Sequence, residues 1–373
     1  MGSPLVEAAH SLDSLVRAHA DEAEQMRRLP SAVVEAFREA GLFRMCVPAE
    51  YGGPTADPMT MMEAVEVLAV ADGSAGWCAN IASTTSSMSC FLPPEHARTI
   101  YADPFVCTGG AYAPTGTGRA VEGGHLVSGS WQWGSGTQHC QWISGGANFD
   151  NGEFHLVFVP VADVEFVDTW YSSGLRGTGS LDFRMNEVFV PEGRSVQPGV
   201  SKPQVDSPIA HFPNFNLLAC GIAACALGIG RRAVDELIDL AQGKTPLFSS
   251  RTLAKSSMAQ VDLARAEAAV CSARAFLYDE VSRAWERVLG GDRIDLPTRA
   301  RVRLACAHAA AESARAVDLM YTQGGGTSVF SAHPLQRCLR DVHTATQHLM
   351  VSPRLLETVG KVMLGVEGDT TAL

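Results

Sequence analysis

The sequence predicts an α+β protein in three parts: an N-terminal helical domain, a small antiparallel β-domain and a C-terminal four-helix bundle. Three observations lead to this fold class. At 373 residues the chain is longer than a single hydrophobic core usually serves. Apolar residues recur at helical spacing near both ends, and a glycine-rich stretch of short alternating segments separates these regions. We place the domains at 1–103, 104–205 and 206–373.

Helical signals fill the first hundred residues. Pro30 stands where a first helical turn begins, apolar residues follow at helical spacing, and Gly41 ends the element. Further helices are expected over 59–71, 76–91 and 95–101.

The chain changes character near Pro104, where glycines begin to punctuate short apolar runs. Residues 154–161 form a candidate strand, and residues 181–186 alternate between apolar and polar side chains. Short strands at such spacing indicate a small antiparallel barrel or sandwich. Helical periodicity returns after Pro203 in four long segments that are sufficient for a bundle, namely 217–241, 256–289, 297–323 and 334–351.

Composition excludes several classes of protein. A net charge of −11 disfavours binding to a phosphate backbone, so no nucleic-acid partner is expected. The longest apolar run, 217–229, is too short to cross a bilayer, and the N-terminus has no signal-peptide pattern, which predicts a cytoplasmic protein without a membrane partner. The ten cysteines are scattered without a C-x-x-C pair, so we expect buried free thiols and no metal.

Short motifs occur in a definite order along the chain: Val47-Pro48-Ala49-Glu50-Tyr51-Gly52-Gly53, Trp131-Gln132-Trp133-Gly134-Ser135-Gly136, Gly174-Leu175-Arg176-Gly177-Thr178-Gly179-Ser180, Val188-Phe189-Val190-Pro191, Gln323-Gly324-Gly325 and Leu335-Gln336-Arg337 before Arg340-Asp341. The segment 174–180 precedes an alternating strand, so it offers no helix N-terminus to a pyrophosphate and is not a dinucleotide-binding loop. Taken in this order, the motifs resemble the acyl-CoA dehydrogenase family over nearly the whole chain. The resemblance implies the same three-part fold and a flavin cofactor.

The motif that ends at Gly136 is the most informative of these. The resemblance implies that it lies along the flavin ring, with the Ser135 hydroxyl near the flavin N5 and O4. A reduced flavin needs an aromatic wall, close backbone and a small hydroxyl, which Trp133, Gly136 and Ser135 supply. A strand-end turn with two core tryptophans is the alternative.

The resemblance also implies cofactor contacts elsewhere in the chain. Tyr112 and Arg251 are expected at the flavin. Arg251 suits the flavin phosphate because a guanidinium can donate two hydrogen bonds to a phosphate group. Gln323, Gly324 and Gly325 are expected to reach the flavin of a neighbouring subunit, as in a homotetramer. A solvated loop arginine and a helix C-cap are the respective alternatives.

The C-terminal region departs from the dehydrogenase pattern. Those enzymes need a carboxylate that abstracts the proton α to the thioester carbonyl, commonly soon after an Arg-Asp pair. Here no glutamate follows Arg340-Asp341 until Glu357, and Thr344 and His348 stand in the intervening segment. This arrangement is similar to the flavin-dependent monooxygenases of the same fold, which hydroxylate phenols, polyketide quinones and sulfur heterocycles.

The resemblance implies that His348 is the active-site histidine. On a continuous helix Asp341, Thr344 and His348 would share one face, with Asp341 held against Arg337 or another cation. A histidine can orient the oxygen donor or accept a phenolic proton near neutral pH. A packed helix histidine is the alternative, and His343 is wrongly spaced to share a metal with His348.

We expect the substrate pocket around Trp77 and the hydroxyl-rich segment that follows it, including Thr85 and Ser86. Many of the related hydroxylases carry a second histidine about eight residues after Gly-Trp, where this chain has Ser83-Thr84-Thr85-Ser86-Ser87. A hydroxyl-rich patch suits a substrate that needs no strong base, such as an amine, a sugar or an acidic quinol.

The sequence therefore predicts a flavin-dependent monooxygenase. The resemblance implies reduced flavin (FMNH₂, or else FADH₂) from a separate reductase, O₂, and a C(4a)-hydroperoxyflavin that hydroxylates an aromatic, polyketide-type or other secondary metabolite. An acyl-CoA dehydrogenase or oxidase with a relocated base is the second hypothesis. A catalytically silent binding or scaffold protein is the third.

Overall fold

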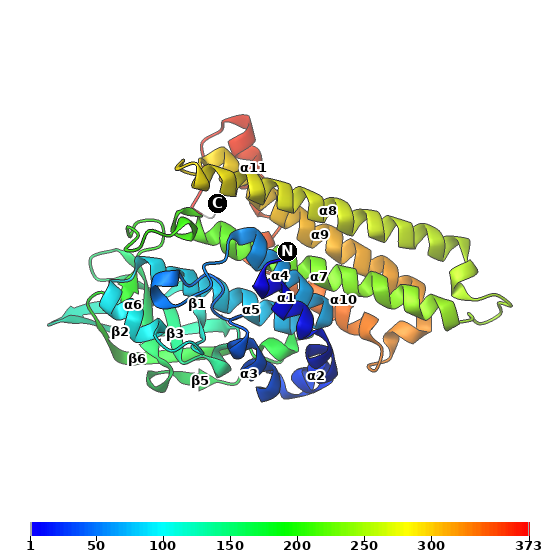
Figure 1. Ribbon diagram of the computed structural model, residues 1–373, viewed down its shortest axis with the longest axis horizontal. Helices are drawn as coiled ribbons and strands as arrows, with labels where there is room; N and C mark the ends of the chain where they lie inside the picture. Colours follow the sequence, from blue (N-terminus) through cyan, green and yellow to red (C-terminus); the bar gives the residue numbers. More distant parts are fainter. Residues whose placement is uncertain (1, 372) are drawn as a thin grey trace.

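The computed structural model describes residues 2–371 and 373, and it confirms the predicted fold class: helices, then a β-sheet, then a helical bundle (Figure 1). The sheet occupies one end of the molecule. The long bundle helices run from beside it toward the opposite end.

The N-terminal part consists of short and medium-length helices. Asp57 and Asp72 accept hydrogen bonds from the backbone N–H groups of Thr60 and Ala75, so each aspartate caps the helix that follows it. The gap between the helices predicted over 59–71 and 76–91 therefore narrows to Asp72, which separates two consecutive buried helices. The helices are α1 (Pro4–Ser11), α2 (Asp13–Met26), α3 (Ser31–Glu39), α4 (Pro58–Ala71), α5 (Gly73–Ser86) and α6 (Pro94–Tyr101).

The central part is one seven-stranded sheet in the order β5-β6-β2-β1-β3-β4-β7. Its strands are β1 (Thr108–Val121), β2 (Gly124–Gly134), β3 (Trp142–Phe149), β4 (Phe154–Pro160), β5 (Glu165–Val167), β6 (Leu181–Pro191) and β7 (Ser195–Val196). The prediction of a purely antiparallel domain is wrong in one respect, since β1 and β3 pair in parallel. The chain passes from β2 on one side of β1 to β3 on its other side, and Ser135 lies in this crossing segment.

The bundle is built around α7 (Asn214–Gly243), which packs against α4, α5 and α9. The apolar run in α7 is longer than the sequence indicated, and the helix meets the length and composition of a membrane span, but 89% of that window is buried inside the protein. The other helices are α8 (Ser257–Leu289), α9 (Leu296–Gly324), α10 (Pro334–Ala345) and α11 (Leu355–Leu364). The fourth bundle helix is thus shorter than predicted, because it ends at Ala345.

Candidate active site

Side chains from all three parts of the chain meet at one place. Trp77 lies on α5, Ser135 follows β2, and His348 follows α10. The Trp77 Nε1–H donates a 3.0 Å hydrogen bond to the Ser135 hydroxyl, and the Trp77 and His348 rings meet edge to face with centroids 5.6 Å apart. The structure therefore brings the predicted catalytic pair together with one predicted pocket residue.

The Ser135 hydroxyl belongs to a hydrogen-bond chain whose direction is fixed. The Thr178 Oγ1 lies 2.8 Å from the Leu175 carbonyl, which can only accept, so Thr178 donates there. Ser180 must then donate across the 2.7 Å contact to Thr178, and Ser135 must donate across the 2.7 Å contact to Ser180. Since Trp77 donates to Ser135, the Ser135 oxygen keeps one lone pair free and has no second proton to offer.

His348 is not on α10, so the predicted helical face shared by Asp341, Thr344 and His348 does not exist. The side chains of Thr346 and Gln347 both donate to the His343 carbonyl, and such local bonds compete with helix continuation. His348 instead has extended backbone and caps the short 3₁₀ helix Leu349–Val351.

The cap fixes the chemistry of the imidazole. His348 Nδ1 accepts a 3.2 Å hydrogen bond from the Met350 N–H, so the proton of the neutral ring lies on Nε2. Burial, together with the charge of Arg303, lowers the pKa of His348 to about 4. The ring is therefore neutral at physiological pH and presents Nε2–H as a donor.

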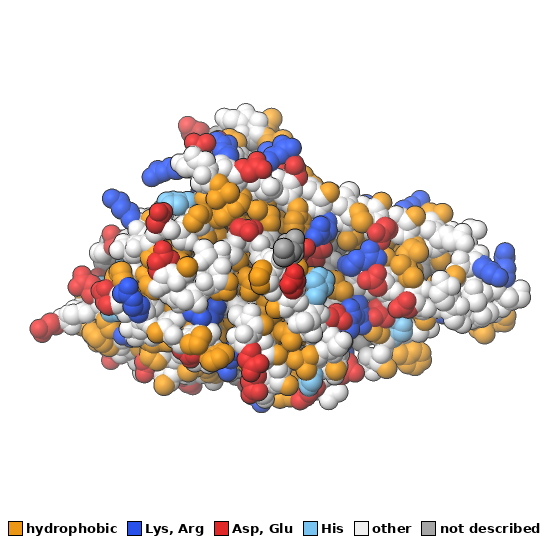
Figure 2. Space-filling view, viewed as in Figure 1, with side chains coloured by type: hydrophobic (Ala, Val, Ile, Leu, Met, Phe, Trp, Pro, Cys, Tyr) orange, Lys and Arg blue, Asp and Glu red, His pale blue; other side chains and the backbone are white. Residues whose placement is uncertain are grey.

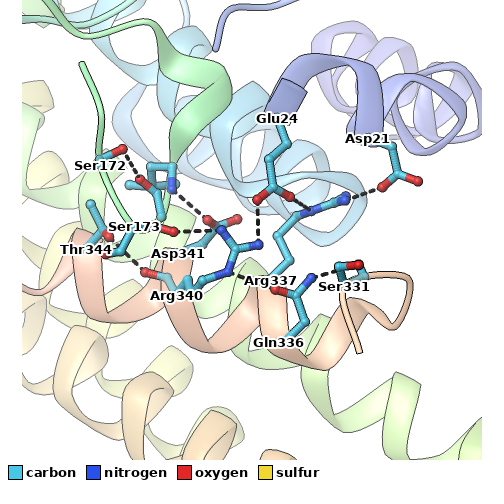
Figure 3. A network of polar contacts seen from close by, with 12 residues as sticks. Asp21, Glu24, Ser172, Ser173, Ser331, Gln336, Arg337, Arg340, Asp341 and Thr344 are labelled. Atoms are coloured by element: carbon cyan, nitrogen blue, oxygen red, sulfur yellow. Dashed lines mark hydrogen bonds and ion pairs between the residues drawn. The ribbon is translucent and has the colours of Figure 1, made fainter. Parts of the chain in front are cut away.

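Asp341 does not pair with Arg337, contrary to the sequence prediction. Figure 3 shows Arg337 directed at Asp21 and Glu24, while Asp341 faces the segment that contains Ser172 and Ser173. Asp341 Oδ1 accepts a 2.6 Å hydrogen bond from the Leu175 N–H. Because the carbonyl of Leu175 ends the hydroxyl chain, this buried aspartate anchors the residue on which that chain ends.

Burial is also the main reason why Asp341 has an unusual acidity. Burial, and then the nearby carboxylate of Asp72, raise its pKa to about 7, against the lowering effects of the Leu175 N–H and two arginines. Both aspartates line a cavity of about 200 Å³ together with residues of α2, α7 and α10. This cavity does not include Trp77, Ser135 or His348.

Trp133 fits a role in holding a planar ligand. Its side chain is 68% exposed, and its backbone has a φ of 64°, a conformation that costs energy for a bulky residue. Gly136 also has a positive φ, of 70°, at the turn directly after Ser135. An exposed aromatic side chain two residues before a buried hydroxyl is an arrangement that a flavin ring can use.

Tyr112, predicted as a cofactor contact, lies near the start of α7, and the two remaining predicted pocket residues lie near the end of α5. The Tyr112 ring packs edge to face on Phe215 at 6.0 Å, and its hydroxyl is buried. The hydroxyls of Thr85 and Ser86 donate to the Ile81 and Ser83 carbonyls of their own helix. These two groups can therefore accept a hydrogen bond from a ligand but have no free proton to donate.

The α7–α8 connection, which contains Arg251, and the C-terminal end of α9, which contains the Gln323–Gly325 motif, lie at the end of the bundle away from the sheet (Figure 1). Arg251 is exposed in the α7–α8 connection. Gly325 is the C-cap of α9, and Lys244 donates to the Gly324 carbonyl beside it. Within one chain, the structure does not bring these predicted cofactor contacts to Ser135.

The cysteines and possible metal ligands give simple results. All ten cysteines are free, and each is buried except Cys271. Within residues 2–371 and 373, no group of three or more His, Cys, Asp or Glu side chains could hold a metal ion.

Comparisons with known proteins identify the family. Residues 7–92 match the model of the acyl-CoA dehydrogenase N-terminal domain, and residues 220–353 match that of the acyl-CoA dehydrogenase C-terminal domain. The chain is 33% identical over 357 residues to indole-3-acetate monooxygenase of Pseudomonas putida, covering 94% of this chain and 90% of that protein. This chain belongs to the flavin-dependent monooxygenases of the acyl-CoA dehydrogenase fold.

Further relatives agree with this assignment. The monooxygenase is 29% identical over 361 residues to the flavin-dependent monooxygenase oxygenase subunit HsaA of Rhodococcus jostii, covering 92% of this chain and 94% of that one. The crystal structure of 3-HSA hydroxylase from Rhodococcus sp. superimposes with a TM-score of 0.92 at 27% identity, covering 100% and 99% of the two chains.

Sequence reasoning missed three residues of the monooxygenase site. Ser180 and Thr178 were read only as part of a glycine-rich motif, and no sequence signal links them to Ser135. Arg303 was not singled out, although a signal exists: it falls on a helical stripe of small apolar residues. The stripe consists of Ala300, Arg303, Ala307, Ala310, Ala314 and Val317, all buried.

Proposed function

We propose that this monooxygenase is the oxygenase component of a two-component system. It takes reduced flavin, FMNH₂ in the first instance, from a separate reductase and inserts one atom of O₂ into a small aromatic molecule. The observation that carries the proposal is the contact of Trp77 with both Ser135 and His348. It places a hydroxyl acceptor and an imidazole donor around the indole ring of Trp77. The names of the relatives, an oxygenase subunit and an arylacetate monooxygenase, support the same assignment.

The described residues fit a reduced flavin. When bound, the flavin supplies the two electrons that activate O₂. Trp133 would cover the ring, Gly136 would allow close approach of the backbone, and Ser135 would meet the ring edge. Arg251, and Gln323 to Gly325, would come from another copy of the chain.

Ser135 would act as an acceptor toward the cofactor. Its own proton is committed to Ser180, so the free lone pair suits an N–H donor such as that at N5 of a reduced flavin. The hydroxyl chain ends on a backbone carbonyl, which holds the serine oxygen in one orientation. Fixed polar groups of this kind need no reorganisation during the reaction.

His348 would act as a donor toward the substrate or the oxygen being transferred. With Nδ1 occupied by the Met350 N–H and the pKa lowered to about 4, the ring is a weak base at pH 7. Of the two roles considered from the sequence, this geometry favours orientation over removal of a phenolic proton.

The carboxylate base that the alternative dehydrogenase chemistry needs is not supplied by Glu357. Glu357, the first glutamate after Asp341, is exposed on α11 and paired with Lys361. Family membership likewise supports an enzyme over a silent scaffold.

The complete enzyme is proposed to be a homotetramer. Apolar side chains are exposed at the outer end of the bundle, notably Leu247, Phe248 and Phe330, close in sequence to Arg251 and Gly325. In Figure 2 some apolar groups are visible at this end, beside Lys or Arg side chains. A monomer in light scattering that retained full flavin affinity would contradict the assembly.

The function is tested by supplying the purified protein with chemically reduced FMN, ¹⁸O₂ and a panel of phenols and indoles. We expect O₂ consumption that depends on reduced flavin, and one ¹⁸O atom in a product. Free flavin under the same conditions is the control. Bleaching of a tightly bound yellow flavin by an acyl-CoA, without any reductase, would instead identify a dehydrogenase.

A further inference from the structure

Arg303 is a buried cation without a counter-ion. It lies on α9 with none of its surface exposed, and it forms no ion pair within residues 2–371 and 373. Burial lowers its pKa, yet a guanidinium stays protonated at neutral pH. A buried charge costs free energy unless it is paired, so an anion bound at this position would be stabilising.

The free atoms of Arg303 form a fork. Nη1 is occupied by the Phe215 carbonyl at 2.9 Å and by the Met350 sulfur at 2.9 Å. Nε and Nη2 are buried without a partner, and among the arginines of the described residues only Arg303 leaves two such nitrogens. These atoms are the two donors on one edge of the guanidinium plane, the geometry that matches a carboxylate.

Another arginine of this chain uses the same two nitrogens to bind a carboxylate. Arg301, two residues earlier on α9, directs its Nε and Nη2 to Glu280. For Arg303 the only groups of the described residues that favour its charged form are the thiols of Cys306 and Cys220. Burial raises the pKa of Cys220 well above its usual value, so that thiol is neutral and does not balance the charge.

Arg303 adjoins the candidate active site. Its charge contributes to the low pKa of His348, and the Met350 that contacts Nη1 also donates its N–H to His348 Nδ1. On the other side, Phe215 links Arg303 to the ring of Tyr112. Contacts run from Ser135 through Trp77 to His348, whose neighbour Met350 contacts Arg303, so two aromatic rings lie between the guanidinium and the Ser135 hydroxyl.

We propose that Arg303 binds a carboxylate of the aromatic substrate through its Nε and Nη2 donors. The proposal rests on the proposed function only in placing the substrate at His348. Because Arg303 has no exposed surface, a neighbouring side chain moves when the ligand enters. Met350 suits this movement, since its unbranched side chain adapts readily and lies on the short 3₁₀ helix after His348.

The test is a binding measurement without flavin or O₂, so it does not depend on monooxygenase activity. Calorimetric titration compares 4-hydroxyphenylacetate, indole-3-acetate and benzoate with their neutral primary amides at pH 7.5. The proteins are the wild type, Arg303→Met, Arg303→Lys and the matched control Arg315→Met, which changes an exposed arginine of the same helix. Thermal melting of each variant confirms folding.

We expect the wild type and the Arg315→Met control to bind at least one acid about 10- to 100-fold more tightly than its amide, the range for a charged bidentate contact. Arg303→Met should abolish that preference and melt no lower than the wild type, because an unbalanced buried charge is gone. Arg303→Lys, which keeps the charge without the fork, should retain only part of the preference and decides the question if Arg303→Met does not fold.

Three results would overturn the proposal. The first is that no acid binds the wild type more tightly than its amide. The second is that the Arg303 variants keep an acid preference equal to that of the wild type. The third is a loss of reduced FMN affinity in Arg303→Lys with acid preference unchanged, which would make the cofactor the anion.

Discussion

Replacing Asp341 with Asn tests whether the site is held by a carboxyl group that still titrates near neutral pH. The pKa of Asp341 rises from 3.8 to about 7, chiefly because the side chain is buried and secondly because Asp72 is close. An asparagine keeps an oxygen that can accept from the Leu175 N–H, so the anchor of the hydroxyl chain survives. The substitution removes only the titration.

The sign of the effect follows from proton binding. Between pH 3.8 and 7 the folded protein holds a proton on Asp341 that the unfolded chain has lost, so stability falls as the pH rises through this window. A rise from 3.8 to about 7 corresponds to an upper bound of about 4 kcal/mol against the ionised form. Between pH 5.5 and 7 the loss amounts to about 2 kcal/mol, and it stays constant at higher pH.

The measurement is urea unfolding of the wild type and of Asp341→Asn from pH 5.5 to 8.5. The free energy of unfolding of the variant, minus that of the wild type, should increase by about 2 kcal/mol toward high pH and level off above pH 7. Asp279→Asn, at an exposed aspartate of α8, is the control and should show no such trend. Parallel curves for wild type and Asp341→Asn would mean that Asp341 is ionised throughout and that the account of its burial is wrong.

Three further outcomes follow from the site. Ser135→Ala should raise the fraction of O₂ released as hydrogen peroxide, measured with a peroxidase assay. It should also cost about 1–3 kcal/mol of stability, because the Trp77 N–H is left unpaired. An unchanged ratio of product to O₂ consumed would mean that Ser135 takes no part in the chemistry. His348→Ala should slow product formation by about 10²- to 10⁴-fold, and the wild-type rate should stay flat from pH 6 to 8 and fall only as His348 is protonated near pH 4; a rate step near pH 6.5 that vanishes in the variant would restore the base role. Arg251→Ala should weaken reduced FMN binding at least about tenfold, since a charged hydrogen bond contributes roughly 1.5–3 kcal/mol. Equal affinity of variant and wild type in equilibrium dialysis would show that Arg251 is a solvated residue without a flavin contact.

Local patterns were sufficient for the helices and for the order of the three parts. Periodicity and prolines gave α3, α4 and α6 closely, because those signals act within one or two turns. The parallel pairing of β1 with β3 was not predictable in the same way. It depends on which side of β1 the chain reaches after Ser135, a choice made by contacts between distant residues.

The site could be predicted from the sequence where a motif marks its residues. The prediction failed where long-range contacts determine the position of a side chain. Trp77, Ser135 and His348 were singled out and do meet. The position of His348 beyond α10 was missed, because local side-chain bonds at Thr346 and Gln347 end a helix whose periodicity alone continues. The partner of Asp341 was also missed, since Leu175 contacts it from 166 positions away along the chain.

The location of the site explains why so many of its supports are polar and buried. Each of its three central side chains comes from a different part of the chain, so no single helix or sheet can fix their spacing. The Trp77–Ser135 bond joins the N-terminal helices to the sheet, and the Leu175–Asp341 bond joins the sheet to the bundle. When a buried hydrogen bond breaks, its donor and acceptor are left unpaired in apolar surroundings, which costs the full desolvation free energy of both groups. Each of these bonds therefore opposes a displacement of one part relative to another more steeply than apolar packing does. Loosening either bond should therefore change the geometry of the site before it unfolds any one part.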